Sequence, residues 1–279
     1  RTPAKGRRAP NRPTVAVEDR LDLGFFQRLF TPGDEKAFVD GCRELSRGDE
    51  DAAVELLQRA ADLVDAAFLL GFLHLKRGDY GAAVPRLEQA LQAGEDLGRT
   101  LQRYGIAALW SLPITEELTV HVGAEPAAAL LALTEARQAQ GDLDGARECL
   151  RELRRRAPDD VVVKVSLAEL LLESPGTGPA REVVELAAGV ENESAAHAAL
   201  LLYQGRALRR LGLSTAARDA LTAALRRRKD RPEALLNAAR YERALVYEER
   251  GRKSRARAEL EKLYADDPAY ADVATRLGL

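Results

Sequence analysis

The sequence predicts an all-α fold, an α-solenoid of stacked antiparallel helix hairpins. Three recurring features lead to this prediction. Small residues recur inside apolar helical stretches, a glycine-centred break follows most of these stretches, and alanine recurs in the helix after the break. The stretch "LLGFLHLKRGDYGAAVPRLEQAL", which begins at Leu69, contains all three features.

The composition allows a large core and disfavours some functions. The 279 residues are 46% hydrophobic, 31% charged and only 5% aromatic, so leucine, alanine and valine must supply most of the core. The formal net charge of −2 argues against a general nucleic-acid binder. The abundance of alanine, leucine and arginine is typical of a bacterial protein with a GC-rich gene.

The cysteines and the apolar runs point to a cytoplasmic protein. The two cysteines, Cys42 and Cys149, are far apart and fit neither a metal motif nor a disulfide framework. No apolar run approaches the ~20 residues that span a bilayer. We therefore expect a reducing compartment and no role for a membrane.

The N-terminal region differs from the rest of the chain. Residues 1–18 are predicted to be a disordered basic tail, because "RTPAKGRRAPNRP" carries five positive charges, no acids and three prolines. Residues 19–33 are predicted to form a short amphipathic helix that docks on the array, since "LDLGFFQRLF" places apolar residues at helical spacing.

The repeated pattern occupies residues 34–279. Glycine tolerates the left-handed conformation that ends a helix, and an aspartate after it can start the next one. Small residues let crossing helices approach closely, and a single hairpin must stack on neighbours to bury its apolar face. The small residues of the first helices are Gly41, Gly71, Gly105, Ala168, Gly205 and Ala244, and the alanines of the second helices are Ala53, Ala83, Ala146, Ala180, Ala217 and Ala256.

These units resemble bacterial tetratricopeptide (TPR) repeats. Ala146 and Ala180 are 34 residues apart, which is the period of that family. About six to seven repeats are expected, with an irregular third unit. The resemblance implies a right-handed superhelix whose first helices line a concave face, and it implies protein or peptide binding.

The third unit departs from the pattern. It begins as "GRTLQRYGIAAL", but residues 111–126 read "SLPITEELTVHVGAEP", with two prolines and an alternation of Leu118, Val120 and Val122. We expect an irregular insertion there with a short strand. At the other end, residues 268–279 are predicted to form a helix that caps the array.

Binding residues are predicted on the inner face of the first helices. The early units would form an apolar groove with aromatic anchors, and the later units would add arginines suited to a carboxylate or phosphate. Two alternatives remain open: a helix at Phe25–Phe30 fills the groove, or the charged part is a solvated face. The predicted partner-binding residues are Phe68, Leu69, Phe72, Leu75, Ile106, Trp110, Tyr203, Arg206, Arg209, Arg210 and Tyr241.

The sequence thus predicts a non-enzymatic scaffold or adaptor that binds a protein segment in the concave groove. Its three histidines lack metal-ligand spacing, and phosphate-loop and nucleophile motifs are absent, so no catalytic residue, metal or cofactor is predicted. One alternative is a nucleic-acid-associated regulator that uses the basic tail and Arg226–Arg231. Another is a structural scaffold that assembles into homo-oligomers.

Overall fold

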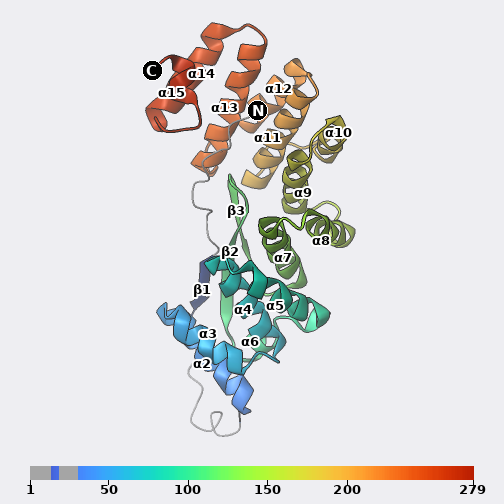
Figure 1. The fold of residues 1–279 in the computed structure, drawn as a ribbon, viewed down its shortest axis with the longest axis vertical. Helices are drawn as coiled ribbons and strands as arrows, with labels where there is room; N and C mark the ends of the chain where they lie inside the picture. The colour runs from blue at the N-terminus through green and yellow to red at the C-terminus, as the bar shows by residue number, and fades with distance from the viewer. Residues whose placement is uncertain (1–13, 19–30) are drawn as a thin grey trace. The chain divides into compact units, whose positions relative to one another are not determined.

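The computed structural model describes residues 14–18 and 31–279, which are mainly helical (Figure 1). The predicted all-α solenoid of helix hairpins is confirmed. The described residues divide into two compact units. The N-terminal unit contains residues 14–18, 31–114 and 119–156, and the C-terminal unit contains residues 115–118 and 157–279.

The N-terminal unit contains three helix hairpins. Their helices are α2 (Gly33–Arg47), α3 (Glu50–Arg59), α4 (Val64–Arg77), α5 (Tyr80–Gln92), α7 (Pro126–Gln140) and α8 (Leu143–Arg156). Between α5 and α7 the chain forms a 3₁₀ turn at Gly94–Asp96, the short helix α6 (Arg99–Arg103) and two strands. Helix α5 nevertheless packs directly against α7, so the intervening residues are an insertion between consecutive hairpins.

The glycine-aspartate breaks act as the sequence predicts. Gly48 and Gly78 end α2 and α4 with φ values of 82° and 75°, which a residue with a side chain rarely adopts. Asp49 and Asp79 then accept hydrogen bonds from backbone N–H groups in the first turns of α3 and α5. Each break therefore ends one helix and starts the next.

The C-terminal unit also contains three hairpins. Its helices are α9 (Val161–Glu173), α10 (Thr177–Leu186), α11 (Ala195–Arg210), α12 (Ser214–Ala224), α13 (Glu233–Glu249), α14 (Lys253–Asp266) and α15 (Val273–Leu277). Helix α11 packs against both α9 and α13. We call these three helices the first-helix row. Val273 and Leu277 of α15 pack with Ala244, Leu260 and Leu263 at the end of this unit.

Glycine is required where the helices of a hairpin cross. A Cβ atom on Gly71 would lie 2.7 Å from the side chain of Leu87, and one on Gly205 would lie 2.5 Å from Leu221. These contacts are closer than packed carbon atoms tolerate. Close helix packing in α4–α5 and α11–α12 therefore depends on the absence of a side chain at the two glycines.

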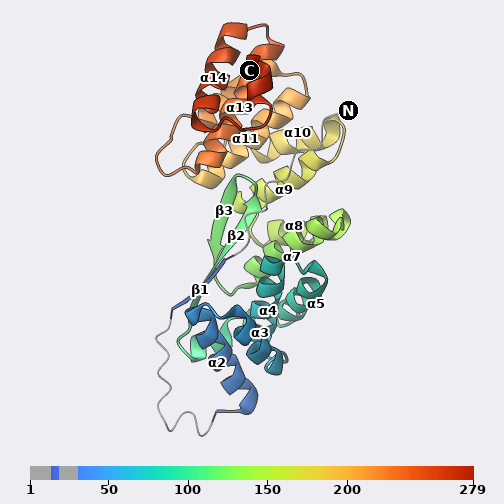
Figure 2. The same cartoon turned by 60° about the vertical axis from the view of Figure 1, so that its left-hand side comes forward.

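The insertion contains strands where the repeat pattern suggested a first helix. Strand β2 (Ala107–Thr115) pairs with β3 (Leu118–Val122) and, on its other edge, with β1 (Thr14–Glu18) (Figure 2). Strands β1 and β2 are antiparallel, with Thr14 opposite Ser111 and Glu18 opposite Ala107. The turn between β2 and β3 is the pair Glu116-Glu117.

Two sequence predictions are corrected by this sheet. The predicted disorder of residues 1–18 is wrong for residues 14–18, because their backbone pairs with β2. The predicted first helix of the third unit ends at Arg103, and Gly105 lies in the following turn with φ of 64°. Residues 1–13 and 19–30 lie outside the described residues, so the amphipathic helix at 19–33 stays a prediction up to Gly33, where α2 begins.

Within residues 14–18 and 31–279, no helix combines the length and the apolar character that a bilayer crossing requires.

Candidate functional site on the first-helix row

The predicted apolar groove is filled in the N-terminal unit. Phe68, Phe72 and Trp110 are completely buried, with the Trp110 ring 4.8 Å from the Phe68 ring and 5.6 Å from the Phe72 ring. The prediction that these residues line an open groove is corrected, because strand β2 inserts Trp110 against α4. The remaining members of that set, Leu69, Leu75 and Ile106, are also buried.

The predicted charged face lies in the C-terminal unit, on α11. Tyr203, Arg206 and Arg209 follow one another at three-residue spacing, so one face of the helix presents all three. Tyr203 is only 3% exposed, and the guanidinium of Arg206 lies 5.0 Å from the centre of its ring. The face therefore combines a buried hydroxyl with a cation held in a fixed position.

A carboxylate from the turn at residues 115–118 binds this face. Nη2 of Arg206 donates to Oε1 of Glu117 at 2.7 Å, and the hydroxyl of Tyr203 lies 3.2 Å from Oε2. The hydroxyl of Thr115 accepts the backbone N–H of Glu117 at 3.2 Å. Glu117 is 7% exposed, whereas its neighbour Glu116 is exposed. The turn thus directs one of two adjacent carboxylates into the protein.

Helices α9 and α13 supply the remaining carboxylates of the site. Glu242 accepts from Nε of Arg206 at 3.1 Å and from Nη1 of Arg209 at 2.6 Å. Glu249 accepts from Nε of Arg209 at 2.8 Å, and Glu169 of α9 lies 3.1 Å from the Tyr203 hydroxyl. Each arginine therefore bridges two acidic groups.

The pKa shifts follow from burial and from these contacts. Burial alone would raise the pKa of Glu117, but the charge and hydrogen bond of Arg206 outweigh it and hold that pKa below 4.5. Burial raises the pKa of Tyr203 well above 10, and the nearby carboxylates of Glu169 and Glu117 raise it further. At neutral pH the site therefore holds an ionised Glu117 and an un-ionised Tyr203.

The two remaining predicted residues make other contacts. Arg210 is exposed, and its guanidinium donates to the backbone oxygens of Leu172 and Ser174 at the end of α9. The hydroxyl of Tyr241 donates to Asp272, and burial together with that hydrogen bond raises the pKa of Tyr241 to about 12. Arg210 and Tyr241 therefore lie outside the site at Glu117.

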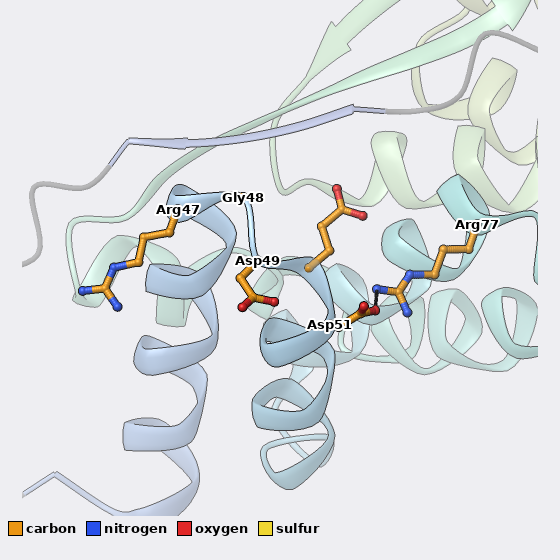
Figure 3. A pocket seen from close by; sticks show the side chains of 6 residues that line it. Arg47, Gly48, Asp49, Asp51 and Arg77 are labelled. Atoms are coloured by element: carbon orange, nitrogen blue, oxygen red, sulfur yellow. Dashed lines mark hydrogen bonds and ion pairs between the residues drawn. The ribbon is translucent and has the colours of Figure 1, made fainter.

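A polar hollow in the N-terminal unit is a weaker candidate. It lies at the α2–α3 break, where Arg77 of α4 bonds to Asp51 of α3 at 2.7 Å (Figure 3). Lys76 and Glu50 form a neighbouring ion pair. These contacts join consecutive hairpins, so a structural role accounts for the charges. The other residues that line this hollow are Arg47, Gly48 and Asp49.

The basic run at Arg226–Arg231 lies in the connection between α12 and α13. Residues 226–230 are exposed, and Arg231 donates to the side-chain oxygen of Asn192 at 3.0 Å. Asn192 in turn donates to the backbone oxygens of Ala223 and Ala224. The last arginine of the run thus helps to hold the end of α12.

The stacked helix hairpins define the class of the protein. It is a TPR-type helical repeat protein, as the resemblance of its repeats indicated. The family model described as "T7SS, ESX-1 secretion system protein EccA1, N-terminal domain" matches residues 75–277, and the chain belongs to this family. No curated protein matches the sequence.

Solved structures show the same fold at low sequence identity. The N-terminal domain of the EccA1 ATPase from the ESX-1 secretion system of Mycobacterium tuberculosis is 19% identical, with a TM-score of 0.64 over 88% of each chain. The quorum sensor NprR from B. thuringiensis, in its apo form, is 11% identical, with a TM-score of 0.55 over 91% of this chain and 71% of its own. The assembly chaperone of RpL4 (Acl4) is 15% identical, with a TM-score of 0.53 over 88% of this chain and 95% of its own.

Proposed function

We propose that this chain is a non-enzymatic protein-interaction domain that binds a segment of a partner protein on the first-helix row of its C-terminal unit. The observation that supports the proposal is the turn at residues 115–118. This turn is itself a polypeptide segment, and α11 holds it through Arg206 and Tyr203. A surface that binds one segment by its side chain has the chemistry to bind another.

The family and one structural neighbour suggest where such a domain could act. The family model is named after a protein of the ESX-1 secretion system, and the neighbour is named as an assembly chaperone. A domain that selects or delivers proteins for secretion fits both. We therefore propose that the partner is a component or a substrate of a type VII secretion system, with the cytoplasm as the compartment of the encounter.

Site-specific photo-crosslinking in the native host tests this function. A photoreactive residue replaces Glu249, whose side chain is 44% exposed on the face that α13 shares with α11. The matched control carries it at Glu182, an exposed residue of the second helix α10. We expect the same partner protein to crosslink reproducibly at position 249 and not at 182. Crosslinks only at 182, or at neither position, would contradict the proposal.

A further inference from the structure

The position occupied by Glu117 has the properties of a ligand site. The carboxylate comes from a turn that interrupts the helical array, whereas every other charged member of the site belongs to the first-helix row. Removing the turn would leave Nη2 of Arg206 without its acceptor and the Tyr203 hydroxyl with Glu169 alone. The site would then lack one carboxylate.

The position of the Glu117 carboxylate favours a negatively charged group. Arg206 is largely buried, with 21% of its side chain exposed, and Tyr203 is more buried still. A buried cation that loses one acceptor is unfavourable, and a neutral group replaces that acceptor poorly. A carboxylate restores both hydrogen bonds and the charge that Glu117 supplies, so the site favours an aspartate or glutamate side chain.

The shape of the site favours a turn over an extended strand. Glu117 reaches Arg206 from a two-residue connection, in which the Thr115 hydroxyl accepts the N–H of Glu117. Thr115 and Leu118 on either side of this connection are buried as well. An occupant must therefore present its acid at the tip of a tight bend.

We propose that Arg206 and Tyr203 form a binding site for an acidic turn of a partner protein, and that the chain's own Glu117 occupies this site in competition with the partner. The inference rests on the proposed function and names the chemistry of the partner. The internal turn is tethered, so it competes at an effective concentration on the order of millimolar. Partner binding is therefore weak until the internal turn is released.

A turn-replaced variant and a synthetic probe test the competition. In the variant, Asn-Gly replaces residues 115–118, which closes the hairpin with a two-residue turn and removes the internal ligand. The probe is a fluorescent, backbone-cyclised peptide of residues 112–121, since a pre-formed turn avoids the cost of ordering. A second cyclic peptide carries glutamine in place of Glu117. Fluorescence anisotropy measures binding of both peptides to the full chain.

We expect the turn-replaced variant to bind the acidic peptide at least about tenfold more tightly than the unaltered chain does. The glutamine peptide should bind at least about tenfold more weakly than the acidic peptide, and Arg206→Gln in the same variant should remove that preference. Equal binding of the two peptides would overturn the inference, as would an acidic preference that survives Arg206→Gln.

A second variant covers the case in which replacing the turn disturbs folding. Glu117→Gln keeps the turn and removes only its charge, and it should also bind the acidic peptide more tightly than the unaltered chain. If both variants keep native helix content and neither binds the acidic peptide more tightly than the unaltered chain, the inference is overturned. If crosslinking at position 249 still captures a partner and Arg206→Gln does not weaken it, the proposed function stands and the acidic-turn inference falls.

Discussion

Glu117 and Arg206 are 89 positions apart in the sequence, and Nη2 of Arg206 donates to Oε1 of Glu117 at 2.7 Å. Glu117 is 7% exposed, so water screens this ion pair little. The pair therefore differs in kind from the many surface ion pairs of the helices, which contribute little to stability.

A double-mutant cycle should detect that difference. We expect Glu117→Gln and Arg206→Gln to couple by about 1–3 kcal/mol in the free energy of unfolding, since buried partners in one network are not independent. Urea denaturation followed by far-UV circular dichroism measures the coupling. The control pair is Arg257 and Glu261, which are both more than half exposed on α14 and should couple by less than about 0.5 kcal/mol. Equal coupling in both pairs would contradict the structure.

Acid should weaken the same contact. The pKa of Glu117 is lower in the folded protein than its ordinary value of 4.5, so the ionised carboxylate stabilises the fold above that pH. The contribution is lost as the pH falls through the folded pKa. The free energy of unfolding of the unaltered chain should therefore exceed that of Glu117→Gln at pH 7, and the difference should shrink below about pH 4.5. A difference that stays constant down to pH 3 would contradict this assignment.

Phe72 is expected to behave as a core residue. Phe72→Ala should destabilise the N-terminal unit by about 3–5 kcal/mol, because it leaves a cavity beside Trp110. Trp110 is the only tryptophan, so its fluorescence during urea denaturation reports on this unit. Leu109→Ala is the control: Leu109 is 58% exposed on the same strand as Trp110, and the change should stay within about 0.5 kcal/mol. Normal stability of Phe72→Ala would return this residue to the candidate binding surface.

Gly205 tests the close packing of α11 on α12. The added methyl group of Gly205→Ala would meet Leu221 at 2.5 Å, so we expect a loss of about 1–3 kcal/mol in thermal or urea unfolding. Gly33→Ala at the start of α2 is the matched control, since nothing lies within 4 Å of its added methyl group. That change should be neutral or stabilise by up to about 1 kcal/mol. An equal effect at both glycines would argue against the tight crossing.

Asp65 is expected to hold the short helix α6 in place. It is fully buried in α4, and its two carboxylate oxygens accept the backbone N–H groups of Gly98 and Leu101 at 2.6 and 2.8 Å. Asp65→Ala leaves both donors unpaired. The free energy of unfolding, measured by Trp110 fluorescence in urea, should fall by about 2–4 kcal/mol. Asp62→Ala, at an exposed position nearby, should cost less than about 0.5 kcal/mol. Similar losses in both variants would contradict this role.

The sequence revealed the repeated fold because its signals are local. Each glycine-aspartate break lies beside the helices that it separates. The stretch "VVVKV" at 161–165 forms the start of α9 despite its strand propensity, because packing within the repeat outweighs that propensity. The same reasoning was wrong for the third unit. Gly105 was predicted to lie where two helices cross, but it lies in a turn after α6. Strand β2 pairs with residues 14–18, a distant partner that no local pattern reveals.

The site was harder to predict than the fold. Arg206 and Arg209 were identified from their helical face, but Glu117 was not, because "TEEL" contains two adjacent glutamates with nothing to distinguish them. Only the folded turn buries one and exposes the other. The spacing of 36 residues between Arg206 and Glu242, close to one repeat, was the signal that could have paired α11 with α13.

The direct packing of α5 on α7 has an evolutionary consequence. Since these two helices pack directly on each other, the tip of the insertion between them can change its sequence while the hairpins on either side keep their packing, provided that Trp110 stays against α4. A lineage could therefore retune what competes for Arg206 by altering a few codons in one loop, and leave the architecture of the array untouched.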